Sequence, residues 1–202
     1  MNPSNILTLC RLAMALVMPF FLTFPIPFGK SIGLLIFLLA ALTDYWDGWL
    51  ARSKYGVTVF GQLMDPLADK VLISAAFICF VTWNQIVPAW IVVIIIAREF
   101  MVTGLRLLGA SQGKIISAGR WGKHKTIWQI IVIAMIISGQ ALRQDILPLF
   151  LSGDVLHAFL TGYYNPLFRM ITVGIAGLVA LLTVVSGTVY FWRCKEWVMK
   201  DA

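Results

Sequence analysis

The chain has 202 residues, of which 60% are hydrophobic and only 12% are charged, and its formal net charge is +7. A soluble domain of this length cannot hide so much apolar surface, so the composition excludes an ordinary soluble protein and favours one membrane-embedded domain over 1–202. On a membrane protein, a positive net charge is typical of basic cytoplasmic loops and of contact with anionic lipid. No nucleic-acid partner is therefore expected.

Apolar stretches long enough to cross a lipid bilayer follow one another along the chain. Their approximate ranges are 5–28, 31–54, 65–83, 86–109, 124–143 and 166–192. Pro19 is expected to interrupt the first stretch, and residues 143–166 are expected to form the longest polar connection. The predicted fold is therefore all-α, a polytopic integral membrane protein with six transmembrane helices.

The basic residues orient these predicted helices. With both termini in the cytoplasm, thirteen of the sixteen Lys and Arg residues fall on the cytoplasmic side, as the positive-inside rule requires. Lys30, Arg143 and Arg169 fall on the other side.

Four of the nine acidic residues lie in the stretch DYWDGWLARSKYGVTVFGQLMDPLAD, from Asp44 to Asp69. Asp44 and Asp47 are three apart near the end of the second stretch, and Asp65 and Asp69 are four apart at the start of the third. Each spacing places a pair on one helix face. Because the connection is short, the two helices are expected to be antiparallel neighbours with all four carboxylates close together at the cytoplasmic surface.

Four ionised carboxylates in one place repel each other and are costly to desolvate. Two divalent cations, Mg²⁺ or Mn²⁺, would neutralise the cluster and hold a diphosphate. Gly48 allows close approach of a ligand, and Arg52 suits a phosphate. Two other interpretations remain open from the residues alone: helix-end carboxylates solvated in a loop, and the ion-coupling site of a transporter.

The same stretch resembles the signature of the CDP-alcohol phosphotransferase family, D-x2-D-G-x2-A-R-x8-G-x3-D-x3-D, at every fixed position and every spacing. The resemblance extends to the six spans and to the N-terminal NILTLCR. It implies an enzyme that moves a substituted phosphoryl group from a CDP-linked donor to an alcohol and releases CMP.

The resemblance also implies residue roles. Asp44, Asp47 and Asp65 would bind two divalent ions, and Asp69, also at the metal site, would be the base that deprotonates the acceptor hydroxyl. The positions that match contacts to the CDP-diacylglycerol donor are Asn5, Thr8, Arg11, Gly48, Ala51, Arg52 and Thr58.

A second basic cluster bears on the acceptor. The segment AREFMVTGLR places Arg98, Glu99 and Arg106 inside an apolar run, and GKHKT places Lys123 and Lys125 before the fifth stretch. Cations beside the aspartates would suit an acceptor that carries its own phosphate. A structural intramembrane pair and an ordinary cytoplasmic loop are the plainer alternatives.

These segments resemble the bacterial phosphatidylglycerophosphate synthases of the family, which join CDP-diacylglycerol to sn-glycerol 3-phosphate. The resemblance implies that Arg98, Arg106, Lys123 and Lys125 bind the glycerol phosphate, that the enzyme is a homodimer, and that it lies in the bacterial cytoplasmic membrane with its site facing the cytoplasm. The alternatives are the same chemistry with inositol phosphate or phosphatidylglycerol as acceptor, an ion-coupled transporter, and a structural scaffold.

Overall fold

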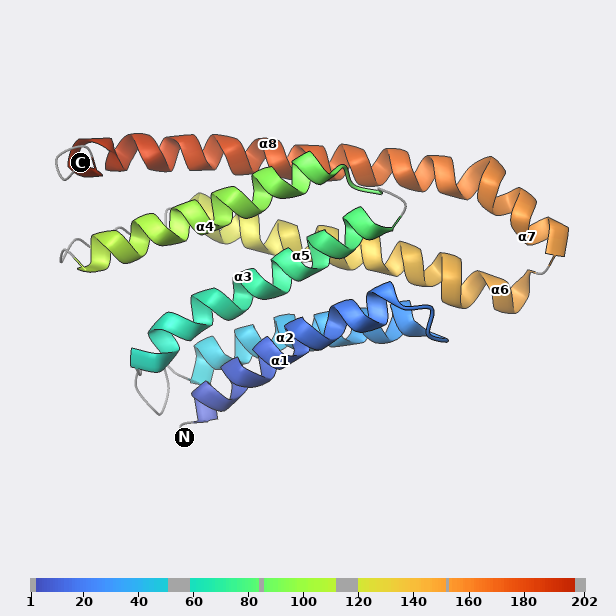
Figure 1. The fold of residues 1–202 in the computed structure, drawn as a ribbon, viewed down its shortest axis with the longest axis horizontal. Coiled ribbons are helices and arrows are strands. Elements are labelled where there is room, and N and C mark those ends of the chain that lie inside the picture. Colours follow the sequence, from blue (N-terminus) through green and yellow to red (C-terminus); the bar gives the residue numbers. More distant parts are fainter. Residues whose placement is uncertain (1–2, 51–58, 84–85, 112–119, 152, 199–202) are drawn as a thin grey trace.

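The computed structural model describes the backbone of residues 3–50, 59–83, 86–111, 120–151 and 153–198. Within these ranges it describes the side chains of residues 5–43, 61, 64–83, 86–107, 109, 126–151 and 153–192. Every regular element in this described part is helical (Figure 1), which confirms the predicted all-α fold class.

Six long helices contain most of the described residues. They are α1 (Pro3–Thr23), α2 (Gly29–Leu50), α3 (Val59–Thr82), α4 (Ala89–Ser111), α5 (Arg120–Ala141) and α8 (Asn165–Val198). Each overlaps one of the predicted apolar stretches, because a helix satisfies its own backbone hydrogen bonds and can therefore lie in lipid.

Length and composition identify this as a membrane protein. Among the described residues, three segments are long and apolar enough to cross a bilayer: Asn5–Thr23, Thr126–Phe150 and Gly153–Trp192. The number of spans and the side on which the termini lie remain predictions.

The first helix does not stop at Pro19. Helix α1 continues through this residue to Thr23, so the predicted interruption is wrong. Proline removes one backbone donor, and membrane helices tolerate the loss when neighbouring groups compensate.

The predicted polar connection over 143–166 is also wrong for the residues that the structure describes. The segment is helical, with η2 (Leu142–Ile146), α6 (Leu147–Phe150), α7 (Gly153–Phe159) and η3 (Leu160–Tyr164) running into α8. Among the glycine and proline residues of this segment, Gly153 begins α7 with a φ of +59° and Pro166 is the second residue of α8, where a helix tolerates proline, whereas Gly162 lies inside η3. Figure 1 shows the resulting hairpin extending beyond the neighbouring turns.

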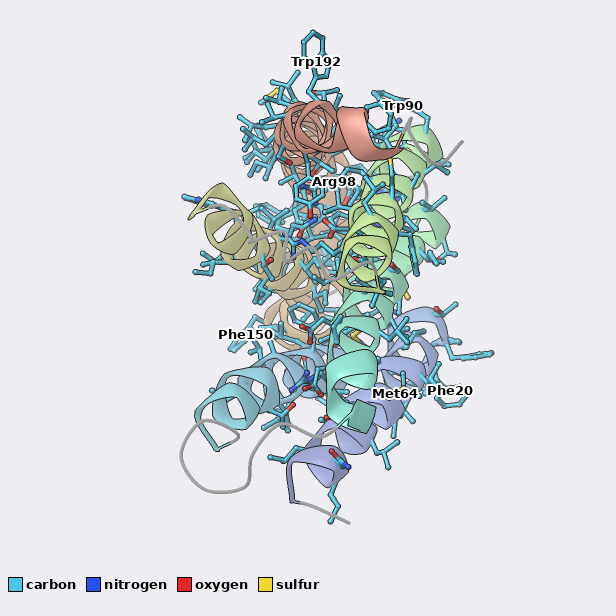
Figure 2. The ribbon with its side chains drawn as sticks, turned by 90° about the vertical axis from the view of Figure 1, so that its left-hand side faces the viewer. Phe20, Met64, Trp90, Arg98, Phe150 and Trp192 are labelled. Atoms are coloured by element: carbon cyan, nitrogen blue, oxygen red, sulfur yellow. The ribbon has the colours of Figure 1, made fainter. Side chains whose placement is uncertain are left out.

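The helices surround a shared core. Helix α1 packs against α2 and α3, α4 packs against α8, and α5 lies between α2 and α8 (Figure 2). Phe37, Phe77 and Phe80 have no exposed surface in this core, whereas Trp90 and Trp192 point outward (Figure 2). An apolar exterior around an apolar core is the pattern expected of helices in lipid.

The start of α1, the end of α2 and the start of α3 lie at one end of the molecule, here called the carboxylate end, and α4 and α8 end on the same side (Figure 1). Side-chain contacts fix the opposite end. Asp145 accepts hydrogen bonds from the backbone N and the hydroxyl of Ser31, both at 2.7 Å, and so caps the first turn of α2. Lys30 and Trp83 both donate to the carbonyl oxygen of Leu22.

Candidate active site

Hydrogen bonds join α1 to α3 at the carboxylate end. The Thr8 hydroxyl donates to Asp65 Oδ1 at 2.6 Å, and Arg11 NH1 donates to Asp69 Oδ1 at 2.9 Å. Thr8 and Arg11 are three residues apart on α1, and their partners are four apart on α3. These spacings put each pair on one helix face, so the two helices meet along a matched polar edge.

Arg11 is the centre of this contact. Its side chain has no exposed surface, whereas the Asp69 side chain is 34% exposed. A buried guanidinium is stable only when it is paired and hydrogen-bonded, and here the Asp69 carboxylate supplies the opposite charge. Arg11 therefore holds the carboxylate in place while part of Asp69 still faces outward.

Thr43 links the same arginine to α2. Arg11 Nε donates to Thr43 Oγ1 at 3.5 Å, and the Thr43 hydroxyl donates to the carbonyl oxygen of Ala40 at 2.7 Å. Thr43 directly precedes Asp44 in the chain. One buried arginine on α1 thus contacts both helices that carry the aspartate motif.

The structure describes the rest of the motif only in part. Asp44, Asp47 and Gly48 lie on the helical backbone of α2, so the two aspartates share a face, but their side chains are outside the described residues. The predicted donor-binding residues Ala51, Arg52 and Thr58 are outside the described residues altogether. Asn5 lies on α1 one turn before Thr8.

The predicted metal site depends on these carboxylates. Among the described side chains, no three or more His, Cys, Asp or Glu residues lie close enough together to hold a metal ion. The side chains of Asp44 and Asp47 are outside the described residues. Asp65 and Asp69, one helical turn apart and held by α1, supply the hard oxygen ligands that Mg²⁺ and Mn²⁺ prefer, so the donor set present fits such an ion.

A second polar cluster joins α4, α5 and α8. Arg98 NH2 donates to Ser186 Oγ at 2.9 Å, and Arg98 NH1 lies 3.7 Å from Glu99 Oε2. Gln129 Nε2 donates to Glu99 Oε1 at 3.3 Å. The cluster supplies the pairing that charged groups inside an apolar helix require. Figure 2 shows Arg98 on the inner side of α8.

Arg106 lies two turns after Arg98 on α4, with its guanidinium carbon 5.5 Å from the centre of the Tyr190 ring. This is a cation–π distance. The remaining predicted acceptor ligands, Lys123 and Lys125, lie in the first turns of α5, and their side chains are outside the described residues.

Sequence reasoning missed several residues of these clusters. They are Thr43, Gln129, Ser186 and Tyr190. A polar side chain inside an apolar helix was the available signal, because it needs a partner there. The identity of that partner depends on the tertiary structure, since Arg98 and Ser186 are 88 residues apart in the sequence.

A buried arginine and paired carboxylates at the ends of apolar helices define a membrane protein with a polar site at one end of its helices. The sequence model of the CDP-alcohol phosphatidyltransferase family matches residues 1–160. The chain belongs to this family, whose members generally depend on divalent cations.

The names of similar proteins are consistent with this family. The chain is 40% identical over 148 residues to the CDP-diacylglycerol–glycerol-3-phosphate 3-phosphatidyltransferase of Bacillus subtilis (strain 168), covering 67% of this chain and 76% of the relative. It is 30% identical over 200 residues to the protein of the same name from Rickettsia bellii (strain RML369-C), covering 97% of each. A third protein of that name, from Salmonella paratyphi A, is 39% identical over 142 residues, covering 66% of this chain and 76% of the relative.

Proposed function

We propose that this chain transfers the phosphatidyl group of CDP-diacylglycerol to sn-glycerol 3-phosphate and releases CMP. The observation that carries the proposal is the joint anchoring of Asp65 and Asp69 by Thr8 and Arg11, within a family signature whose named relatives are enzymes of this type. Anchored carboxylates supply the fixed geometry that phosphoryl transfer requires.

Asp44, Asp47, Asp65 and Asp69 would hold two divalent cations, Mg²⁺ or Mn²⁺. When bound, such ions supply charge neutralisation for the diphosphate and for the leaving CMP. Asp69 takes the proton from the acceptor hydroxyl, whose oxygen then forms a bond to the phosphorus that carries diacylglycerol. The bond from that phosphorus to the CMP oxygen breaks. Arg11 fixes the Asp69 carboxylate by ion pairing, which supports its use as a positioned base.

The donor nucleotide would lie against the N-terminal half of α1 and the segment that follows Asp47. The proposed contacts are Asn5, Thr8, Arg11, Gly48, Ala51, Arg52 and Thr58. Thr8 and Arg11 are almost fully buried and bonded to the aspartates, so they also orient the carboxylates. The proposed ligands of the acceptor phosphate are Arg98, Arg106, Lys123 and Lys125, because guanidinium and ammonium groups suit a phosphate dianion.

The proposal places one domain, over 1–202, in the bacterial cytoplasmic membrane. It has six spans, both termini and the carboxylate end in the cytoplasm, and a homodimeric assembly. The apolar segments and the bacterial relatives support this placement.

The test is CMP release by purified protein in detergent, with CDP-diacylglycerol, Mg²⁺ or Mn²⁺, and a panel of alcohols. Release with glycerol 3-phosphate that stops on chelation is the expected result. Release with inositol phosphate or phosphatidylglycerol would keep the chemistry and replace the acceptor. No release with any alcohol, together with cation-dependent transport in vesicles, would replace the enzyme by a transporter.

A further inference from the structure

The face of α8 that meets α4 is shaped around Arg98. A Cβ at Gly187 would lie 2.9 Å from Arg98 Cγ, so a larger residue would displace the arginine. Ser186, next to this glycine, accepts a hydrogen bond from Arg98 and donates one to the carbonyl oxygen of Thr183 at 3.0 Å. Tyr190 lies one turn further along the same face and carries Arg106 over its ring.

This contact leaves donors without acceptors. Arg98 Nε, Arg106 Nε and the Tyr190 hydroxyl are buried, and none has a hydrogen-bond partner among the described residues. A buried polar atom without a partner is costly and uncommon, so a cluster of three needs a cause. Guanidinium groups can only donate, and a phenol can donate. The missing partner is therefore a group rich in acceptor oxygens.

The charge of the cluster specifies the partner further. Arg98 and Arg106 bring two positive charges, and Glu99 brings one negative charge that is already bonded to Gln129 and close to Arg98. The remaining positive charge favours an anion over water. Arg106 and Tyr190 lie toward the ends of α4 and α8 on the side of the carboxylate end (Figure 1), which is where an acceptor substrate must arrive.

We propose that Tyr190 is a ligand of the acceptor phosphate, donating its hydroxyl to a phosphate oxygen beside Arg106. Ser186 is a positioning residue that holds Arg98 toward the same anion. Helix α8 thus supplies one wall of the acceptor site and contributes to the choice of a phosphorylated alcohol. This inference rests on the proposed function, because it assigns a further ligand to the same substrate.

Tyr190→Phe tests the assignment, because it removes the hydroxyl and keeps the ring that Arg106 contacts. Tyr163→Phe is the matched control: the same change at a side chain that is 76% exposed in η3. The Michaelis constants for glycerol 3-phosphate and for CDP-diacylglycerol are measured for both variants. Binding of glycerol 3-phosphate and of inorganic phosphate is measured separately by calorimetry in detergent.

For Tyr190→Phe we expect the Michaelis constant for glycerol 3-phosphate and the dissociation constant for phosphate to rise about tenfold, the effect of losing one charge-assisted hydrogen bond. The constant for CDP-diacylglycerol and the turnover at saturation should stay within about twofold. Tyr163→Phe should change none of them.

The outcomes separate the two proposals. If the wild-type protein releases CMP with glycerol 3-phosphate but Tyr190→Phe binds it as tightly, the assignment of Tyr190 is overturned and the function stands. If the wild-type protein releases no CMP with this alcohol, the function is overturned. The calorimetry still decides whether Tyr190 binds phosphate, and equal affinities in both variants would refute it.

Discussion

The two arginine clusters of the molecule differ in how their charge is met. Arg11, fully buried between α1, α2 and α3, donates to the carboxylate of Asp69 and to Thr43. In the α4–α8 cluster Arg98 NH1 lies 3.7 Å from Glu99 Oε2 and Arg106 lies over the Tyr190 ring. Buried N–H groups on both arginines have no partner among the described residues.

The two arrangements suit two different roles. A buried arginine with its own carboxylate holds a geometry, because removing either partner leaves an uncompensated charge. Arginines in excess over carboxylates, with donors unmet, are arranged to receive an anion. One cluster therefore fixes the reacting carboxylates, and the other is proposed to bind the acceptor.

The largest effect is expected for Asp69→Asn. Asparagine retains an oxygen that accepts from Arg11, but it cannot take a proton and it removes the charge opposite the buried guanidinium. Turnover should therefore fall by about a thousandfold and the midpoint of thermal unfolding should fall as well, while the folded protein still binds CDP-diacylglycerol. Steady-state CMP release and equilibrium binding of the donor check this. Asp154→Asn, at the exposed start of α7, is the control and should change neither turnover nor donor binding. Undiminished turnover in Asp69→Asn would remove the base from the mechanism.

Asp47→Ala should weaken binding of the donor and leave the contacts of Arg11 unchanged. Loss of a carboxylate that binds the cations should weaken metal-dependent binding of CDP-diacylglycerol by at least about a hundredfold. Titration of the donor with and without Mn²⁺ measures the effect. Donor binding that stays metal-dependent and unweakened would contradict the assignment of two ions to the four aspartates.

Lys125→Ala tests the acceptor side of the comparison. Because a cation beside the phosphate is lost, the Michaelis constant for glycerol 3-phosphate should rise about tenfold. That for CDP-diacylglycerol should hardly change. Arg169→Ala, an exposed cation near the start of α8, provides the matched loss of charge. Equal increases for both substrates would exclude Lys125 from the acceptor site.

The smallest effect is expected for Thr8→Val, which keeps the shape and removes the hydrogen bond to Asp65. The protein should lose about 1 kcal/mol of stability, seen as a lower midpoint of thermal unfolding in detergent. Turnover should fall only a few-fold, since Arg11 still holds Asp69. Thr161→Val removes a comparable hydroxyl at an exposed position in η3. If both variants behave alike, the Thr8–Asp65 contact does not orient the site.

The sequence predicted the long helices because apolar stretches and their breaks are local properties. The same local reasoning failed at Pro19 and over 143–166, where proline and glycine were interpreted as interruptions. In the structure α1 continues through Pro19, and Gly153 begins a helix. Proline leaves one backbone carbonyl without its helical donor, and helices in lipid continue through such a residue where neighbouring groups compensate.

Spacing also predicted that the aspartates lie in pairs on helix faces, and it identified Arg98 and Glu99 as charges in need of partners. It did not give the contacts between helices. Thr8 and Asp65 are 57 residues apart, and Ser31 and Asp145 are 114 apart. Such pairs depend on how whole helices pack against each other, and this packing cannot be predicted from the local pattern of a single sequence.

The most direct test of the central claim is an experimental structure of the protein with Mn²⁺ and glycerol 3-phosphate bound. We expect anomalous scattering from Mn²⁺ beside Asp65 and a phosphate between Arg98, Arg106 and Tyr190, with the glycerol hydroxyl directed toward Asp69. A phosphate bound elsewhere, with the α4–α8 cluster unchanged, would contradict the division between a cluster that fixes carboxylates and one that receives the acceptor.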